Sequence, residues 1–175
     1  MKSHCCKYTA GLKTILILLV VVSGLSMAQA ADKQVIGWLE RVHIKEADML
    51  LDAKVDTGAD VTSIKANILQ KFKRDGVEWV RFRLQNKLGH RVVVERKIER
   101  YANIKRSLAP SLQRPVVKLG VCVGKHYRNV EVNLAVRKRF KYNMLVGRNF
   151  LRGVFLVDSE RQFSVQPACQ GVKGD

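Results

Sequence analysis

The stretch LLDAKVDTGADVTSIKA, Leu50 to Ala66, carries an apolar alternating run directly into an acid, a hydroxyl and a glycine. Alternation in LLDAKV predicts a strand, which places Asp56 at the end of that strand. Asp-Thr-Gly alone is typical of an ordinary surface turn, because Asp caps nearby backbone amides and Gly tolerates positive φ. The alternative is that the turn holds the Asp56 carboxylate at a site where it does chemistry.

Two flanking features favour the second alternative. The segment from Ala59 to Ser63 does not have the extended polar composition that is typical of a loose loop. Much later comes YNMLVGRNFL, Tyr142 to Leu151, an apolar strand that ends in Gly147 and passes into Arg148. Two apolar residues and a glycine beneath an Asp-Thr-Gly loop would support its carboxylate.

VDTGAD together with LVGRNFL resembles the retropepsins, the one-domain aspartic proteases typified by retroviral enzymes. The likeness is closest to their bacterial relatives, historically labelled "putative ATP-dependent zinc protease". It extends through RPVVKLGVCVG and the VNL of EVNLAV, roughly residues 36–158. The resemblance implies an all-β fold, a small closed barrel of six to eight strands with one or two short helices. It also implies an aspartic-type endopeptidase.

The resemblance assigns roles residue by residue. Asp56 becomes the catalytic aspartate, and Thr57 bonds to its copy across a dimer axis. Asp60 and Arg148 become an ion pair that braces the loop. The full set expected to support the active-site loop is Thr57, Gly58, Ala59, Asp60, Val146, Gly147 and Arg148.

The segment from Tyr101 to Pro115 is weakly patterned and reads either as a long irregular loop or as the elaboration of a hairpin. By resemblance, residues 101–114 fall where the substrate-covering flap belongs, although the glycine-rich tip of the viral enzymes is missing. The flap residues expected on this basis are Ser107, Leu108, Ala109, Pro110 and Ser111.

The chain contains one Asp-Thr-Gly, whereas this type of hydrolysis needs two carboxylates that share a proton. We therefore expect two copies to meet about a two-fold axis, each contributing one Asp56. The expected partners are a second copy of the chain and a peptide or protein substrate.

Short alternating segments predict most of the remaining structure. Ser63 to Lys71 and Arg148 to Gly153 are the two segments expected to be helical. The expected strands are Val35 to Ile44 and Met49 to Val55, a hairpin formed by residues 78–85 and 90–101, a second hairpin formed by residues 114–124 and 127–136, and a last strand over residues 161–166.

Residues 1–30 have the pattern of a secretory signal peptide: a basic start, an apolar run, and Ala28-Gln29-Ala30. We expect cleavage near Ala31, export to the periplasm and no stable membrane anchor afterwards, with residues 31–175 as one domain. Cys122 and Cys169 remain in that oxidising compartment and could form a disulfide, but spacing does not show whether they meet.

The formal net charge of +17 falls to +14 without the lysines of residues 1–30. This charge is either a solvated surface or an attraction for an acidic envelope partner. No nucleic-acid motif accompanies it, so nucleic acid is not an expected partner. A non-catalytic envelope binding module with a basic surface is the alternative function. The sequence lacks both a phosphate-binding glycine loop and H-E-x-x-H, and its histidines are scattered, so no cofactor or metal is expected.

Overall fold

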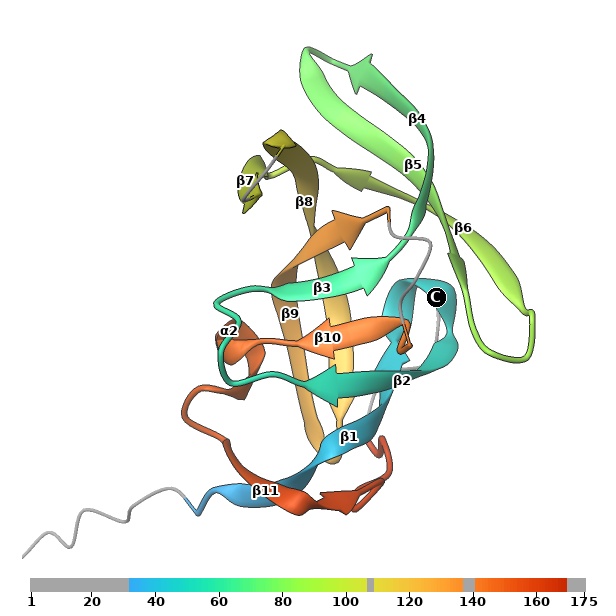
Figure 1. Cartoon of the computed structure of the whole chain (residues 1–175). Helices are drawn as coiled ribbons and strands as arrows, with labels where there is room; N and C mark the ends of the chain where they lie inside the picture. The colour runs from blue at the N-terminus through green and yellow to red at the C-terminus, as the bar shows by residue number, and fades with distance from the viewer. Residues whose placement is uncertain (1–31, 107–108, 137–140, 170–175) are drawn as a thin grey trace, which may run out of the picture. The chain divides into compact units, whose positions relative to one another are not determined.

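The computed structural model describes residues 32–106, 109–136 and 141–169. Its main sheet has the strand order β11-β1-β2-β10-β3-β9-β8-β7 (Figure 1). A further pairing of β1 with β8 closes β1, β2, β10, β3, β9 and β8 into a ring. The strands of this sheet are β1 (Gln34–Ile44), β2 (Met49–Val55), β3 (Thr62–Lys65), β7 (Arg100–Arg106), β8 (Ala109–Val123), β9 (His126–Ala135), β10 (Met144–Val146) and β11 (Phe155–Gln162).

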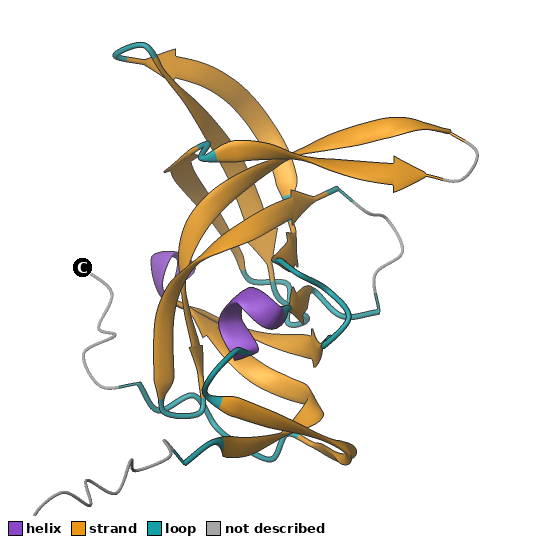
Figure 2. Cartoon of the chain, turned by 90° about the vertical axis from the view of Figure 1, so that its left-hand side faces the viewer, coloured by secondary structure: helices purple, strands orange, loops and turns teal. Residues whose placement is uncertain are grey.

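The prediction of an all-β fold is confirmed. In the described residues the helical parts are a 3-10 turn, η2 (Lys45–Ala47), and one short helix, α2 (Arg148–Leu151) (Figure 2). The helix predicted over Arg148 to Gly153 is therefore present in shorter form. The strands predicted over Val35–Ile44 and Met49–Val55 are β1 and β2 with almost the same bounds.

A second sheet of three strands follows β3: β4 (Asn67–Arg74), β5 (Val77–Gln85) and β6 (Arg91–Lys97). Alternate β5 side chains, Val80, Phe82 and Leu84, are buried and belong to the same core cluster as the main sheet. Their burial follows from the period of two along a strand. The small sheet is thus packed onto the ring by its apolar face.

The helix predicted over Ser63 to Lys71 is wrong, because this segment forms β3 and β4. Ile64 and Ala66 are buried and Ile68 is partly buried, so the apolar residues follow a period of two. β3 is also paired on both sides, with β10 and with β9. Pairing with segments distant in sequence decides the conformation here.

The single strand predicted over residues 90–101 is also corrected, since the chain changes sheets within it. The amide of Ile98 bonds the carbonyl of Glu78 in the small sheet at 2.9 Å. The next amide, that of Glu99, bonds the carbonyl of Val116 in the main sheet at 2.9 Å. The chain thus passes from one sheet to the other between two adjacent residues. The alternation of apolar and polar residues along the sequence does not reveal this change.

Tyr101 to Pro115 is not irregular: β7 and β8 pair across it, with Tyr101 opposite Pro115 and Ile104 opposite Leu112. Of the two alternatives, the hairpin is the one observed. Its paired arms extend away from the rest of the sheet (Figure 2). The prolines and small residues of this segment give no alternation of apolar and polar side chains. Its strands are held instead by backbone pairing between β7 and β8.

The last strand is β11, Phe155–Gln162, which runs parallel to β1, and not the predicted strand over residues 161–166. The segment after β11 is held by other bonds. Buried Glu40 accepts the amides of Ser164 at 3.1 Å and Val165 at 3.2 Å, as well as the Ser164 hydroxyl. A buried carboxylate is tolerated where donors surround it in this way.

Cys122 and Cys169 form a disulfide with a Cα–Cα distance of 6.1 Å, which attaches this C-terminal segment to β8. Residues 1–30, for which we predicted a signal peptide, lie outside the described residues. Within the described residues, no helix has the length and apolar character needed to cross a membrane. The same residues contain no group of three or more His, Cys, Asp and Glu that could hold a metal ion.

Candidate active site

Asp56 lies immediately after β2, where the chain leaves the sheet. Its backbone amide donates to the carbonyl of Val146 at 2.9 Å. Its carboxylate Oδ1 accepts the amide of Gly58 at 3.0 Å, and its carbonyl accepts the amide of Ala59 at 3.3 Å. This tight turn holds a partly exposed carboxylate at the strand end.

β10 supports the turn, since it lies between β2 and β3 and ends at Val146, directly before Gly147. A Cβ at Gly147 would stand 2.8 Å from the carbonyl carbon of Val61 and 3.0 Å from the carbonyl oxygen of Ala59. Both are backbone atoms and cannot rotate away. The approach of β10 to the Asp56 loop therefore requires glycine at this position.

Arg148 joins the parts of the loop to one another. Its Nη1 donates to the carbonyls of Thr57 and Gly58, both at 3.0 Å, and its Nη2 forms an ion pair with Asp60. Its own backbone amide donates to the carbonyl of Ala59 at 2.8 Å. The ion pair that the resemblance implies is present, but it is exposed: 79% of the Asp60 side chain and 41% of that of Arg148 are accessible.

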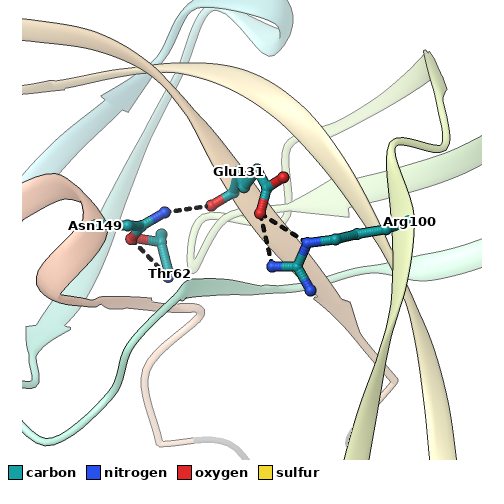
Figure 3. Close-up of polar contacts among 4 residues, drawn as sticks. All are labelled: Thr62, Arg100, Glu131 and Asn149. Atoms are coloured by element: carbon teal, nitrogen blue, oxygen red, sulfur yellow. Dashed lines mark hydrogen bonds and ion pairs between the residues drawn. The ribbon is translucent and has the colours of Figure 1, made fainter.

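A second polar network lies beside the loop (Figure 3). Buried Thr62 donates through its hydroxyl and its amide to Oδ1 of Asn149, at 2.8 and 2.9 Å, and its hydroxyl accepts the amide of Gly147 at 3.1 Å. Asn149 Nδ2 donates to the carbonyl of Glu131 at 2.8 Å. Arg100 contacts Glu131 Oε2 with two donors at 2.6 and 2.9 Å. The chain of bonds runs from β7 to the loop.

Sequence reasoning missed these four residues of the second network, Thr62, Arg100, Glu131 and Asn149. Asn149 directly follows Gly147-Arg148 and Thr62 closely follows the Asp56 turn, so both lie within the two stretches already singled out. Glu131 and Arg100 carry no such signal, because only the pairing of distant strands brings them together.

The remaining predicted site residues divide into two groups. Thr57 and Gly58 are exposed in the single chain, and Ala59 is partly so. Of the expected flap residues, Ala109, Pro110 and Ser111 lie at the start of β8, while Ser107 and Leu108 lie outside the described residues.

The all-β fold, and an Asp-Thr-Gly turn supported by β10 and the glycine after it, are the features of a retropepsin-like protein. Residues 35–168 match the RimB-like family, described as "Retropepsin-like aspartic endopeptidase RimB". The chain belongs to this family.

Two relatives and one solved structure each match about three quarters of this chain. The chain is 35% identical over 128 residues to a "Probable alpha-L-glutamate ligase" of Shewanella pealeana, and 31% identical over 140 residues to one of Desulfotalea psychrophila. These alignments cover 71% and 78% of this chain but only 27% and 30% of the relatives, so the chain spans less than a third of their length. A crystal structure of a Legionella pneumophila protein of unknown function is 30% identical, with a TM-score of 0.67, and the match covers 77% of this chain and all of that one.

Proposed function

We propose that this protein is an aspartic endopeptidase whose active site forms when two chains meet, each contributing Asp56. The observation that carries the proposal is the geometry of the Asp56 turn, fixed from below by Val146 and Gly147 and from the side by Arg148. A single chain supplies one such turn. The exposed residues Thr57 and Gly58 beside it offer a surface on which a second copy can complete the site.

The proposed reaction uses the two Asp56 carboxyl groups in opposite roles, one ionised and one protonated. The ionised group takes a proton from water as the water oxygen attacks the peptide carbonyl carbon. The protonated group gives its proton to the carbonyl oxygen. When the C–N bond breaks, the proton taken from water passes to the leaving nitrogen. A hydroxyl of the tetrahedral intermediate returns its proton to the other Asp56 carboxylate as the new carboxyl group forms. Both products are released and the pair again holds one proton.

The proposed compartment is the periplasm, by the signal-peptide pattern of residues 1–30, and the proposed substrate is a peptide or protein. The names of the relatives refer to a ligase of L-glutamate, and this chain matches only part of their length. We therefore assign no ligase reaction to this chain. Glutamate-rich peptides belong among the substrates to be tried.

The test is to incubate purified protein with a diverse peptide library that includes glutamate-rich members, from about pH 4 to 8, and to identify new termini by mass spectrometry. Wild type should cleave and Asp56→Asn should not. Asp75→Asn is the matched control, because Asp75 lies in the β4–β5 turn at φ 52°, a conformation that Asn also adopts. Equal cleavage by wild type and Asp56→Asn would refute the proposal.

A second candidate function is a non-catalytic binding module for acidic envelope partners, which the net charge of +14 without residues 1–30 favours. The same variant separates the two functions. A binding module keeps its full affinity for an acidic partner in Asp56→Asn and shows no turnover in either form.

A further inference from the structure

A pocket of about 570 Å³ lies where the small sheet meets the main sheet. Its basic lining residues are Lys65, Arg83, Lys87 and Arg91, and it has no acidic one. Side-chain amides, including those of Gln85 and Asn143, make up much of the rest of the polar lining. The pocket therefore offers hydrogen-bond donors and positive charge to whatever enters it.

Strand register explains why these side chains gather. Arg83 and Gln85 are two residues apart on β5 and so project from the same face of the small sheet. Asn67 lies opposite Arg83 on β4, and Arg91 lies opposite Gln85 on β6, so both join that face. The opposite face of β5 carries the buried apolar side chains that pack on the core. One wall of the pocket is thus built from regular backbone.

The second wall comes from the main sheet, and direct bonds fix it to the first. Asn143 Nδ2 donates to the carbonyl of Gln85 at 2.7 Å, and the Lys65 amide donates to the carbonyl of Asn143 at 2.7 Å. These bonds hold the end of β3, the end of β5 and the segment before β10 in one arrangement. The position of Lys65 relative to β5 is therefore set by the fold.

The charges of the pocket are mostly uncompensated. Lys87 is paired with Asp52 at 2.5 Å. Arg91 donates Nε to the neutral Gln85 Oε1 at 3.2 Å, which leaves its charge in place. Across the described residues neither Lys65 nor Arg83 forms an ion pair with an acid. Like charges held together repel, and a bound anion would remove that repulsion.

The pocket is separate from the Asp56 turn. β3 begins at Thr62, beside the turn, and Lys65 is at its other end. β10 ends at Val146, which bonds Asp56, whereas Asn143 precedes its start. Three strand residues span roughly 10 Å, so an anion in the pocket does not contact the carboxylate.

We infer that this pocket is a binding site for a polyvalent oxyanion, with Lys65 and Arg83 as its main charged donors and Arg91 as a third. Two adjacent anionic groups, either phosphates or carboxylates, fit a pocket of this size lined by several donors. Arginine and lysine bind both kinds of group through charge-assisted hydrogen bonds. The inference does not depend on the proposed peptidase activity.

The test is calorimetric titration of the full-length protein with inorganic pyrophosphate in one arm and citrate in the other, with amide chemical shifts recorded by NMR. We expect saturable binding at one site per chain, weakening with added salt, with the largest shifts at Lys65, Arg83 and Asn143. Stronger binding of pyrophosphate identifies a phosphate ligand, and stronger binding of citrate identifies a carboxylate ligand. Asp56→Asn should bind as wild type does, which separates this test from that of the peptidase.

Lys65→Gln and Arg83→Gln should each weaken binding about tenfold, because each removes a charge-assisted hydrogen bond. Lys73→Gln is the matched control, since Lys73 is an exposed lysine on β4 outside the pocket and its loss changes the net charge equally. Unfolding curves show whether each variant is folded. Absence of binding of both anions at low salt, or equal weakening in Lys73→Gln, would overturn the inference and leave only diffuse surface charge.

Discussion

The backbone amide of Asp56 donates a 2.9 Å hydrogen bond to the carbonyl of Val146, so the candidate catalytic residue is fixed by a strand that lies far from it in the sequence. β2 and β10 are parallel neighbours in register, with Val55 opposite Val146. The turn therefore depends on both stretches, and substitutions in either one should disturb it.

Gly147→Ala should disrupt the turn strongly. The added Cβ would stand within 3.0 Å of backbone atoms of Ala59, Val61 and Thr62, and we expect a loss of about 3 kcal/mol of unfolding free energy together with activity. Gly120→Ala is the comparison, because its Cβ would meet the exposed ring of Tyr127, which can move aside. Urea unfolding measures both. Equal, small losses would show that β10 can shift away from the loop.

Arg148→Ala should destabilise the protein more than Asp60→Ala does. The exposed ion pair alone contributes about 0–1 kcal/mol, so Asp60→Ala should be mild. Arg148→Ala also removes the hydrogen bonds to the exposed Thr57 and Gly58 carbonyls, and we expect a further loss of about 1 kcal/mol. The comparison uses urea unfolding at fixed pH. If the two variants lose the same free energy, the carbonyl contacts of Arg148 contribute nothing.

The sequence predicted both the turn at Asp56 and the glycine that supports it. Each follows a short apolar run that is recognisable in the sequence by itself. The resemblance to retropepsins implied the ion pair of Asp60 with Arg148, but it did not indicate that this pair is exposed. β3 was mistaken for a helix because its strand character depends on pairing with β9 and β10. For the same reason, Glu131 and Arg100 gave no signal, since their contact exists only after the sheet has formed.

Thr62 and Asn149 should be energetically coupled. Asn149→Ala removes the acceptor of the buried Thr62 hydroxyl, and we expect a cost of about 1–3 kcal/mol. Thr62→Val removes the hydroxyl itself, so the double variant should cost less than the sum of the two. A double-mutant cycle from unfolding curves measures this coupling. Additive losses would contradict a direct role for this bond.

His126 should make stability fall in mild acid. Burial, together with the positive charges of Lys125 and Arg128, lowers the pKa of His126 below its ordinary value of 6.5. The unfolded chain therefore binds the extra proton first, and unfolding free energy decreases as pH falls from about 6.5 through the lowered pKa. His126→Gln should flatten this part of the profile of unfolding free energy against pH, and the exposed His90→Gln should not. An unchanged slope in His126→Gln would contradict the assignment.

The most direct test of the shared active site mixes wild-type chains with an excess of Asp56→Asn chains and follows peptide cleavage. Mixed dimers carry one carboxylate and one amide, and an amide cannot share the proton or exchange the acid and base roles. The account predicts that activity per wild-type chain falls as mutant is added, and falls also on dilution below the dimer dissociation constant. Activity per wild-type chain that stays constant in both experiments would contradict the paired Asp56 mechanism.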